Sequence, residues 1–339
     1  MMDCAITRSP GTTTQAPLAT LCGHRRSPIG RRMLAAPDQR RCLPDGMGVE
    51  MRTMRDGWGV RSAMRAGDGA AGSVLVLNGR GDFMEKYAEL IHDLSGRGYG
   101  VASFDWRGQG GSGRLLGDAR GHASDFAPWL GDLAEQVAWF RATLPPPYYA
   151  VAHSMGAHLL LRHLSRHPDF ARAVLLSPMV GLQAAPIGPW LARHVAALAC
   201  ALGNGEAYAP GNGALARGLP GTLRQRRLTH DLGRYADEGW WLEQHPEWAL
   251  GGVTNGWLNA AFASIDALAA PGVPEGIGTP LLILTAEGEA LVDNAATVRL
   301  AARLPHARVR DFAGAGHELV REIDAIRLPV FEAIAEFLA

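Results

Sequence analysis

The sequence predicts an α/β protein in which helices cover both faces of a mostly parallel sheet, with a mainly helical segment inserted late in the sheet. Two observations indicate this fold class. Short apolar runs that end in turn residues alternate with longer runs whose apolar residues recur at helical spacing, a rhythm typical of parallel sheets. The alternation breaks after residue 180 and resumes at about residue 276. With 47% hydrophobic and 19% charged residues, the 339-residue chain can bury a large core.

The expected elements follow one another along the chain. Strands are expected at residues 73–79 (SVLVLNG), 99–108 (YGVASFDWRG), 148–154 (YYAVAHS), 171–178 (ARAVLLSP), 278–289 (GTPLLILTAEGE) and 307–312 (ARVRDF). Helices are expected at residues 85–98 (EKYAELIHDLSGRG), 125–145 (DFAPWLGDLAEQVAWFRATLP) and 328–338 (LPVFEAIAEFL), and another follows the strand at 148–154. Glycines or prolines close most of these runs, as they do where helices and strands end.

The chain is expected to have three parts. Residues 46–180 and 276–339 form the core, and residues 181–275 form a lid, because an insertion late in a parallel sheet lies over the carboxyl ends of the strands, where such folds bind ligands. Residues 1–45 are rich in arginine and lack hydrophobic periodicity. They are expected to be a disordered extension, or to precede a working start nearer Met33 or Met47. A basic arm that touches anionic lipid is the alternative.

The bulk composition narrows the function classes. The 33 basic residues balance 33 acidic residues, so no net field attracts nucleic acid, and no nucleic-acid partner is expected. The four cysteines form no C-x-x-C pair, which argues against a zinc site or a disulfide framework and favours a reducing, cytoplasmic location. No apolar run approaches the roughly 20 residues that span a bilayer. The pattern specifies no oligomeric state.

Ser154 lies in AHSMG, at the joint between a predicted strand and a predicted helix. A nucleophile on such a strained turn needs small residues two positions before and after it, and Ala152 and Gly156 meet this need. The helix N-terminus favours developing negative charge, and the Met155 backbone N–H is a candidate oxyanion donor. The alternative is that Ser154 only caps the helix.

A serine nucleophile needs a base, and the base needs an orienting acid. In this kind of fold the chain order is serine, acid, histidine. His317 follows a strand and a glycine turn (RVRDFAGAGHELV) and is the expected base, with a surface-loop histidine as the alternative. The expected acid is Glu289, a few residues past the point near Ala286 where the apolar run of this strand ends. Asp293 is the alternative acid, although it also makes a natural helix N-cap.

Two glycine-rich loops differ in what they predict. The loop NGRGDF after the first predicted strand is expected to supply a second oxyanion donor, the Arg80 backbone N–H, and Gly79 and Gly81 let the chain approach a substrate closely. The loop RGQGGSGR matches G-x-G-x-x-G, but a dinucleotide site opens directly into a helix, and RLLGDARGHASD follows here. No cofactor and no metal are therefore expected.

Four motifs in this order resemble the α/β-hydrolase branch of bacterial lysophospholipases and monoacylglycerol lipases: NGRGDFMEKYAEL, FDWRGQGGSGR, AHSMGAHLLL and GAGHELVRE. The segment GGVTNGWLNAAF is similar to the lysophospholipase side of that group. The resemblance runs from about Gly57 to the C-terminus. The sequence departs from the usual pattern at Asn78 (usually His), and at Ala152 and Ala157 (usually Gly), but none of these positions carries a reacting group.

The resemblance implies a cofactor-independent serine ester hydrolase that acts on single-chain lipids such as lysophospholipids or monoacylglycerols through an acyl-enzyme. Its residues would be nucleophile Ser154, base His317, acid Glu289 (Asp in many relatives), and the Arg80 and Met155 amides as oxyanion donors. Three lid residues are expected to bind the acyl chain, unless they only form the core of the lid: Trp240, Trp241 and Trp257. Peripheral contact with the inner membrane is expected because the substrate is insoluble. A peptidase or thioesterase with the same triad, and a non-catalytic binding protein, are the rivals.

Overall fold

The computed structural model describes residues 37–69, 71–184, 187–214 and 221–339. Its centre is an eight-stranded sheet of order β1-β2-β4-β3-β5-β6-β7-β8. The strands are β1 (Gly48–Thr53), β2 (Gly59–Arg65), β3 (Ser73–Leu77), β4 (Gly100–Phe104), β5 (Tyr148–His153), β6 (Arg172–Leu176), β7 (Leu281–Ala286) and β8 (Ala307–Phe312). Strand β2 runs antiparallel to β1 and β4, and all other pairs are parallel. The predicted fold class is therefore confirmed, with an antiparallel β1–β2 edge that the sequence pattern did not indicate.

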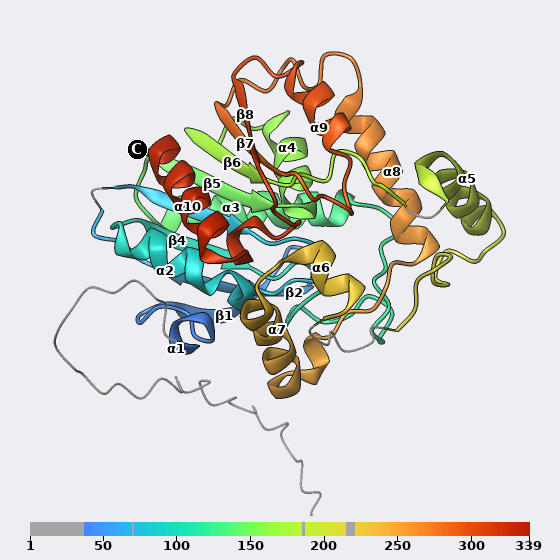
Figure 1. Ribbon diagram of the computed structural model, residues 1–339, viewed down its shortest axis with the longest axis horizontal. Coiled ribbons are helices and arrows are strands. Elements are labelled where there is room, and N and C mark those ends of the chain that lie inside the picture. Colours follow the sequence, from blue (N-terminus) through green and yellow to red (C-terminus); the bar gives the residue numbers. More distant parts are fainter. Residues whose placement is uncertain (1–36, 70, 185–186, 215–220) are drawn as a thin grey trace, which may run out of the picture. The chain divides into compact units, whose positions relative to one another are not determined.

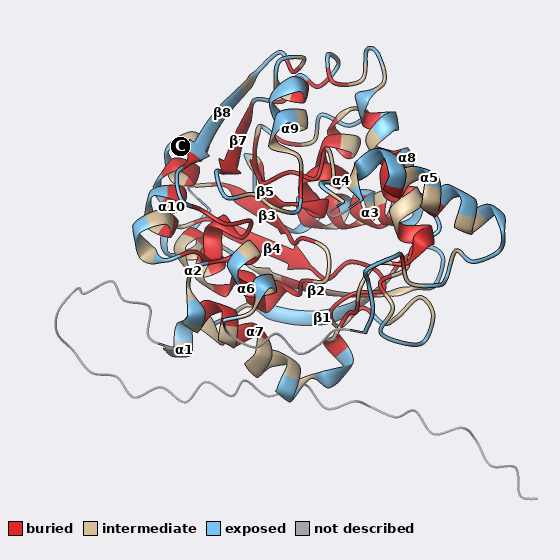
Figure 2. Ribbon diagram, turned by 45° about the vertical axis from the view of Figure 1, so that its right-hand side comes forward, coloured by how far each residue is buried: buried red, intermediate tan, exposed pale blue. Residues whose placement is uncertain are grey.

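Helices cover both faces of the sheet, because alternate strand residues point to opposite sides. In β3, for example, Leu75 and Leu77 join one buried cluster while Val74 and Val76 join the other. The first cluster lies under α3 (Ala127–Thr143), α4 (Met155–Leu164) and α9 (Asn294–Ala301), and the second under α2 (Ala88–Gly96) and α10 (Asp324–Leu338) (Figure 1). Figure 2 shows buried central strands and more exposed edge strands, β1 and β8.

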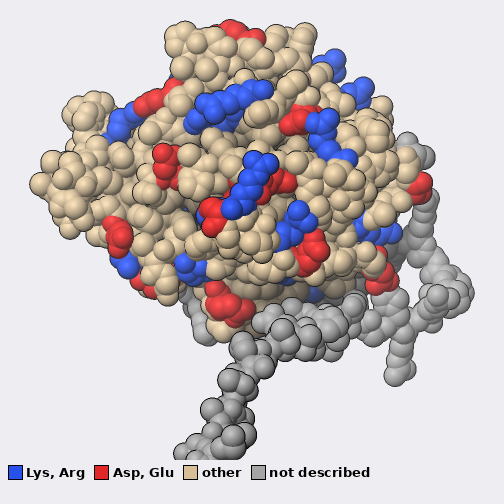
Figure 3. Space-filling view, turned by 180° about the vertical axis from the view of Figure 1, so that it is seen from behind, with Lys and Arg blue, Asp and Glu red and all other residues tan. Residues whose placement is uncertain are grey.

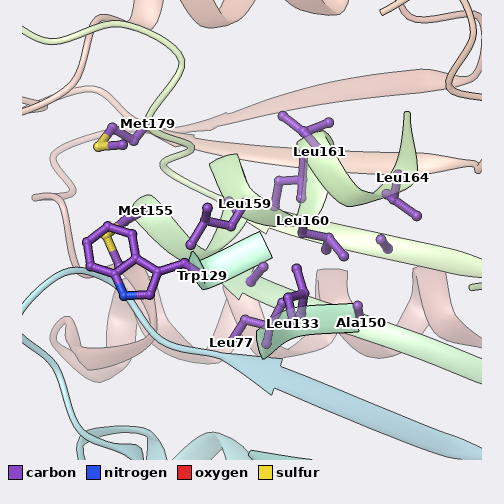
Figure 4. Packing of buried hydrophobic residues seen from close by; sticks show 14 of the residues in the cluster. Leu77, Trp129, Leu133, Ala150, Met155, Leu159, Leu160, Leu161, Leu164 and Met179 are labelled. Atoms are coloured by element: carbon purple, nitrogen blue, oxygen red, sulfur yellow. The ribbon is translucent and has the colours of Figure 1, made fainter. Parts of the chain in front are cut away.

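Helix α4 is buried along almost its whole length, since it lies between the sheet and other helices. Leu159, Leu160 and Leu161 are all fully buried. Figure 4 shows them in one packed layer with Trp129 of α3 and Leu77 of β3. This packing fixes the first turn of α4, and therefore the residue that precedes it, against the sheet.

The segment expected to form a lid contains α5 (Gly188–Ala201), α6 (Leu223–Leu228), α7 (Leu232–Gln244), the short 3-10 helix η2 (Pro246–Trp248) and α8 (Asn255–Ala269). Of these, α8 also belongs to the core, because Trp257, Ala261 and Leu268 pack into the cluster under α3 and α4. None of the helices in the described parts of the chain is long and apolar enough to cross a membrane.

The expected N-terminal extension lies largely outside the described residues. Residues 37–45 lie inside them and begin with α1 (Pro37–Arg40), which packs against α2. Just after this helix, Arg41 donates a 2.7 Å ion-paired hydrogen bond to Asp237 of α7. The described fold thus starts before residue 46, where the sequence pattern placed the start of the core. Arg41, which was expected to belong to the disordered extension, instead pairs with the buried carboxylate of Asp237.

Candidate active site

Ser154 occupies a strained turn between β5 and α4. Its φ of 51° and ψ of −114° form a combination that residues other than glycine rarely adopt, and such outliers concentrate at functional sites. The turn also brings the helix start against β3: a Cβ on Gly156 would lie 2.4 Å from the Asn78 carbonyl oxygen. The Ser154 hydroxyl caps no amide of α4. It is therefore available for a partner outside the helix.

That partner is His317, in the loop after β8. His317 Nε2 lies 3.0 Å from Ser154 Oγ, and His317 Nδ1 lies 2.6 Å from Glu289 Oε2. Glu289 follows β7, so all three side chains come from the carboxyl edge of the parallel strands. The other carboxylate oxygen of Glu289 accepts hydrogen bonds from the amides of Leu291 at 2.8 Å and Val292 at 3.2 Å. The carboxylate is thus held in place from behind while it faces the imidazole.

The electrostatics of this pair favour a histidine that accepts a proton. Burial opposes the charged form of His317, but the charge of Glu289 and its hydrogen bond outweigh burial and raise the pKa of the imidazole. Burial likewise opposes ionisation of Glu289, while His317 and the two backbone amides outweigh it and lower the pKa of the carboxyl. An ionised acid beside a buried imidazole is the arrangement that stabilises an imidazolium formed during proton transfer.

The alternative acid, Asp293, lies elsewhere. Its side chain accepts from the Ala295 amide at 2.9 Å, and so caps α9. It also approaches Arg299 at 3.3 Å, on a partly exposed surface. Of the two carboxylates that the sequence offered, the structure brings Glu289 and not Asp293 to His317.

Two backbone amides near Ser154 stay unused. On either side of Arg80, the Gly79 amide donates to Asp82 Oδ2 at 3.1 Å, and the Gly81 amide donates to Gln109 Oε1 at 2.5 Å. Within the part of the chain that the structure describes, neither the Arg80 amide nor the Met155 amide has an acceptor. Met155 begins α4, where backbone N–H groups point out of the helix end. Both amides are free to bind an anion.

A buried ion cluster lies behind residues 313–318, which carry His317 and are called the histidine loop below. The sequence pattern gave no sign of this cluster. Its centre is Lys86, the only lysine of the chain, whose side chain is 2% exposed. The ammonium pairs with Asp82, with Glu238 of α7 at 3.1 Å and with Glu318 at 3.0 Å. Burial opposes this charge, but the three carboxylates outweigh it and raise the pKa of Lys86. The cluster joins three segments: residues 78–83, here called the oxyanion loop after its proposed role, helix α7 of the segment expected to form a lid, and the residue after His317.

The three lid tryptophans have different surroundings. Trp240 is partly exposed and stacks under Arg41, with 5.0 Å from the guanidinium carbon to the ring centre. Trp241 packs against Trp248, with 5.8 Å between ring centres. Trp257 is 5% exposed and belongs to the core cluster beneath α3. Among the described residues, none of the three forms a hydrogen bond with Ser154.

The loop that matches G-x-G-x-x-G is a series of tight turns. Gly108, Gly110 and Gly113 all have positive φ, and the Gly111 amide donates to Asp105 at 2.8 Å. The next helix, α3, begins only at residue 127, so the loop lacks the helix N-terminus that a pyrophosphate needs. Among the described residues, no three His, Cys, Asp or Glu side chains converge as a metal site requires.

Comparisons with known proteins identify the family of the chain. The family model described as serine aminopeptidase, S33, matches residues 68–324. The chain is 35% identical over 280 residues to lysophospholipase L2 of Escherichia coli (strain K12), covering 78% of this chain and 79% of that protein. It is 34% identical over 268 residues to a probable lysophospholipase L2 of Haemophilus influenzae, covering 78% and 83% respectively.

Solved structures show the same fold. A soluble variant of monoglyceride lipase from Saccharomyces cerevisiae, in complex with a substrate analog, matches with a TM-score of 0.69 at 17% identity, over 88% of this chain and 97% of that one. The monoacylglycerol lipase of Paleococcus ferrophilus matches with a TM-score of 0.63 at 22% identity, over 82% and 98%. The resemblance expected from the sequence motifs is confirmed, and the chain belongs to the serine aminopeptidase, S33, family of α/β-hydrolases.

Proposed function

We propose that this protein is a serine ester hydrolase that cleaves single-acyl-chain lipids. The observation that carries the proposal is the continuous hydrogen-bonded chain from Ser154 through His317 to Glu289, next to two unused backbone amides. The lysophospholipase L2 relatives, matched over most of their length, support a lipid ester as the substrate. The family description alone would also suit a peptidase, so the test includes both substrate classes.

The geometry leads to a two-step reaction. His317 Nε2 removes the hydroxyl proton as Ser154 Oγ attacks the ester carbonyl, and Glu289 stabilises the imidazolium that forms. The negative oxygen of the tetrahedral intermediate binds to the amides of Arg80 and Met155. His317 then protonates the leaving alcohol, which leaves an acyl group on Ser154. Water, activated by His317, attacks this acyl group and releases the fatty acid.

The test is labelling by a fluorophosphonate, followed by intact mass, for the wild type and Ser154→Ala in parallel. One adduct is expected on the wild type and none on the variant. Hydrolysis of lipid esters should fall by ~10⁴-fold or more in Ser154→Ala. A panel of lysophospholipid, monoacylglycerol, acyl thioester and aminoacyl anilide then separates an esterase from a thioesterase or peptidase. A folded wild type that takes no adduct would contradict the proposal and favour a binding protein.

The proposal includes peripheral contact with a membrane through α5. This helix projects from the fold beside α8 (Figure 1). It carries two large exposed apolar side chains, Trp190 (71% exposed) and Leu198 (61%), and Leu202 (68%) follows directly after its last residue. Figure 3 views the molecule from behind, so the side on which α5 projects lies at the left, and the outermost lobe there shows few charged side chains. An exposed apolar surface on a lipid hydrolase suits insertion into the lipid layer that holds its substrate.

A further inference from the structure

A cavity of about 210 Å³ opens beside the oxyanion loop. Arg80 and Gly81 of that loop form one wall, and segments of the lid form the rest. The lid residues with large side chains in this lining are Arg224, Glu238, Leu242, Trp248 and Leu250. The cavity therefore begins at the residue whose amide is the proposed oxyanion donor, and two arginines, Arg80 and Arg224, line it.

The Arg80 side chain is held in place but is not neutralised. Its Nη2 donates to the Gly251 carbonyl oxygen at 2.6 Å, and the guanidinium lies 5.4 Å from the ring centre of Trp257. Its Nε is buried without an acceptor, and among the described residues Nη1 forms no hydrogen bond and no carboxylate forms an ion pair with Arg80. A guanidinium normally presents a fork of N–H donors to an anion, and here part of that fork is unused.

The surrounding backbone makes room for this side chain. A Cβ on Gly121 would lie 1.9 Å from Arg80 Nη2. Only glycine at this position lets the guanidinium reach the Gly251 carbonyl. The position of the Arg80 side chain on the wall of the cavity is therefore fixed by its surroundings. Its unpaired N–H groups do not reflect a mobile side chain on the surface.

The charges around the cavity leave an excess of positive charge. The ion cluster and the cavity wall together hold four cations, Arg80, Lys86, Arg224 and Arg321, against three carboxylates, Asp82, Glu238 and Glu318. Lys86, Arg224 and Arg321 each pair with at least one of these carboxylates, and Arg80 pairs with none.

The carboxylates stay ionised in spite of burial. Burial opposes ionisation of Glu238, but Lys86 and Arg224 outweigh it and lower its pKa to about 2. For Arg80, burial and the nearby Arg224 lower the pKa of the guanidinium to about 10. The Arg80 guanidinium is still charged at neutral pH, and it gains from an anion that would restore its lost solvation.

From this arrangement we infer that Arg80 and Arg224 form a subsite for the phosphate diester of a lysophospholipid head group. The inference rests on the proposed ester hydrolysis and names the substrate class within it. In a lysophospholipid only the glycerol carbons separate the acyl ester from the phosphate. One residue, Arg80, then serves both ends of this unit, with its amide on the oxyanion and its side chain on the phosphate. The neutral head of a monoacylglycerol makes no use of the second contact.

The kinetic test compares two substrates with the same oleoyl chain in the same detergent micelles, lysophosphatidylglycerol and monooleoylglycerol. In Arg80→Gln, kcat/KM on the lysophospholipid is expected to fall about 10- to 100-fold, as for a lost hydrogen bond to a charged group, and the loss on the monoacylglycerol to be much smaller. Arg80→Lys, which keeps the charge but not the fork, should restore part of the selectivity. Arg55→Gln, at a side chain that is 89% exposed, is the matched control and should leave the ratio unchanged.

Equal losses on both lipids would overturn the inference, because a purely structural Arg80 would affect every substrate alike. The absence of any loss on the lysophospholipid would overturn it too. If the wild type cleaves neither lipid, the proposed ester hydrolysis is what has failed, and a binding measurement still decides on the subsite.

The binding measurement is thermal melting with glycerophosphoglycerol, inorganic phosphate or glycerol added. The Tm of the wild type is expected to rise with glycerophosphoglycerol and not with glycerol, and Arg80→Gln and Arg224→Gln should abolish the rise. No rise in the wild type, or the same rise in the variants, would overturn the subsite. A larger rise with inorganic phosphate than with the diester would overturn the assignment to a lipid head group in favour of free phosphate.

Discussion

At the scale of single residues, the proposed roles of Glu289 and His317 predict that the reaction depends on pH in a defined direction. A histidine that acts as the base works only when it is neutral, so kcat/KM should fall as the pH drops through the pKa of His317, which Glu289 holds above the ordinary 6.5. In Glu289→Gln the carboxylate charge is gone and burial dominates, so this limb should move below pH 6.5. The rate should also fall by roughly 10³–10⁴-fold. The imidazolium would lose the negative charge that stabilises it, and the hydrogen bond that holds His317 in the tautomer with a proton on Nδ1 would be lost.

The measurement is a pH–rate profile for both proteins. Asp293→Asn is the control, since Asp293 caps α9 and does not touch His317. An unchanged acidic limb in Glu289→Gln would show that another group sets the pKa of the base.

Gly156 tests the strained turn itself. In Gly156→Ala the new Cβ would meet the backbone carbonyl oxygens of Asn78 at 2.4 Å and Leu77 at 2.9 Å, and neither can swing away as a side chain would. We expect a loss of about 1–3 kcal/mol in the free energy of unfolding, with weaker fluorophosphonate labelling of Ser154. Gly131→Ala is the matched control: Gly131 is an exposed residue inside α3 with open space around it, so alanine should stabilise by about 0.5–1 kcal/mol. Equal denaturant midpoints for the two variants would contradict this account.

At the scale of elements, the proposed contact with lipid belongs to α5. Replacing Trp190 and Leu198 by glutamine removes two apolar side chains from the proposed membrane surface, each worth about 1.5–3 kcal/mol when buried. Partition onto lipid vesicles, followed by co-sedimentation, should therefore weaken by at least about tenfold. Hydrolysis of a short-chain ester in solution serves as the reference that shows whether the α5 variant keeps an intact active site. Met51→Gln on β1 and Val298→Gln on α9, both exposed, should leave partition unchanged. If these two variants lose as much affinity as the α5 variant, the contact is not specific to α5.

At the scale of the whole molecule, the sequence predicted what depends on local pattern. Buried strands are short apolar runs, and each run ends where the sheet has its carboxyl edge, so the positions of Ser154 and His317 followed from the strands before them. Strand β1 was not predicted because its residues are mostly exposed and show no clear alternation. The role of α8 in the core was hidden because its apolar residues suit a lid as well as a core.

Long-range charge pairing could not be predicted either. Lys86, Glu238 and Glu318 are far apart in the sequence, and an ion pair leaves no periodic trace in the residues around it. The same reason hid the cavity beside Arg80, whose walls come from the oxyanion loop and from the lid. Order along the chain is enough to propose the groups that react, whereas the proposed phosphate subsite can be recognised only when distant segments are seen folded together.

The ion cluster around Lys86 ties these distant segments into one unit, and Lys86→Met tests that role. Removing the buried cation leaves Asp82, Glu238 and Glu318 without it, and breaking a buried pair in this way costs about 3–5 kcal/mol. A carboxylate with a depressed pKa stabilises the fold above its unfolded pKa and loses this contribution as the pH falls through its folded pKa. The pKa of Glu238 is ordinarily 4.5 and is about 2 in the folded protein. The loss of stability in the variant, relative to the wild type, should therefore be full at pH 7 and shrink between pH 4.5 and pH 2.

The measurement is urea unfolding of the wild type and Lys86→Met across this pH range. Lys86→Arg is the control that keeps the positive charge, and it should recover part of the stability at pH 7, limited by the larger guanidinium. A deficit that stays constant as the carboxylates protonate would mean that Lys86 contributes by packing. A deficit that follows their titration would show that one buried ammonium holds the lid helix α7 and the histidine loop to the oxyanion loop.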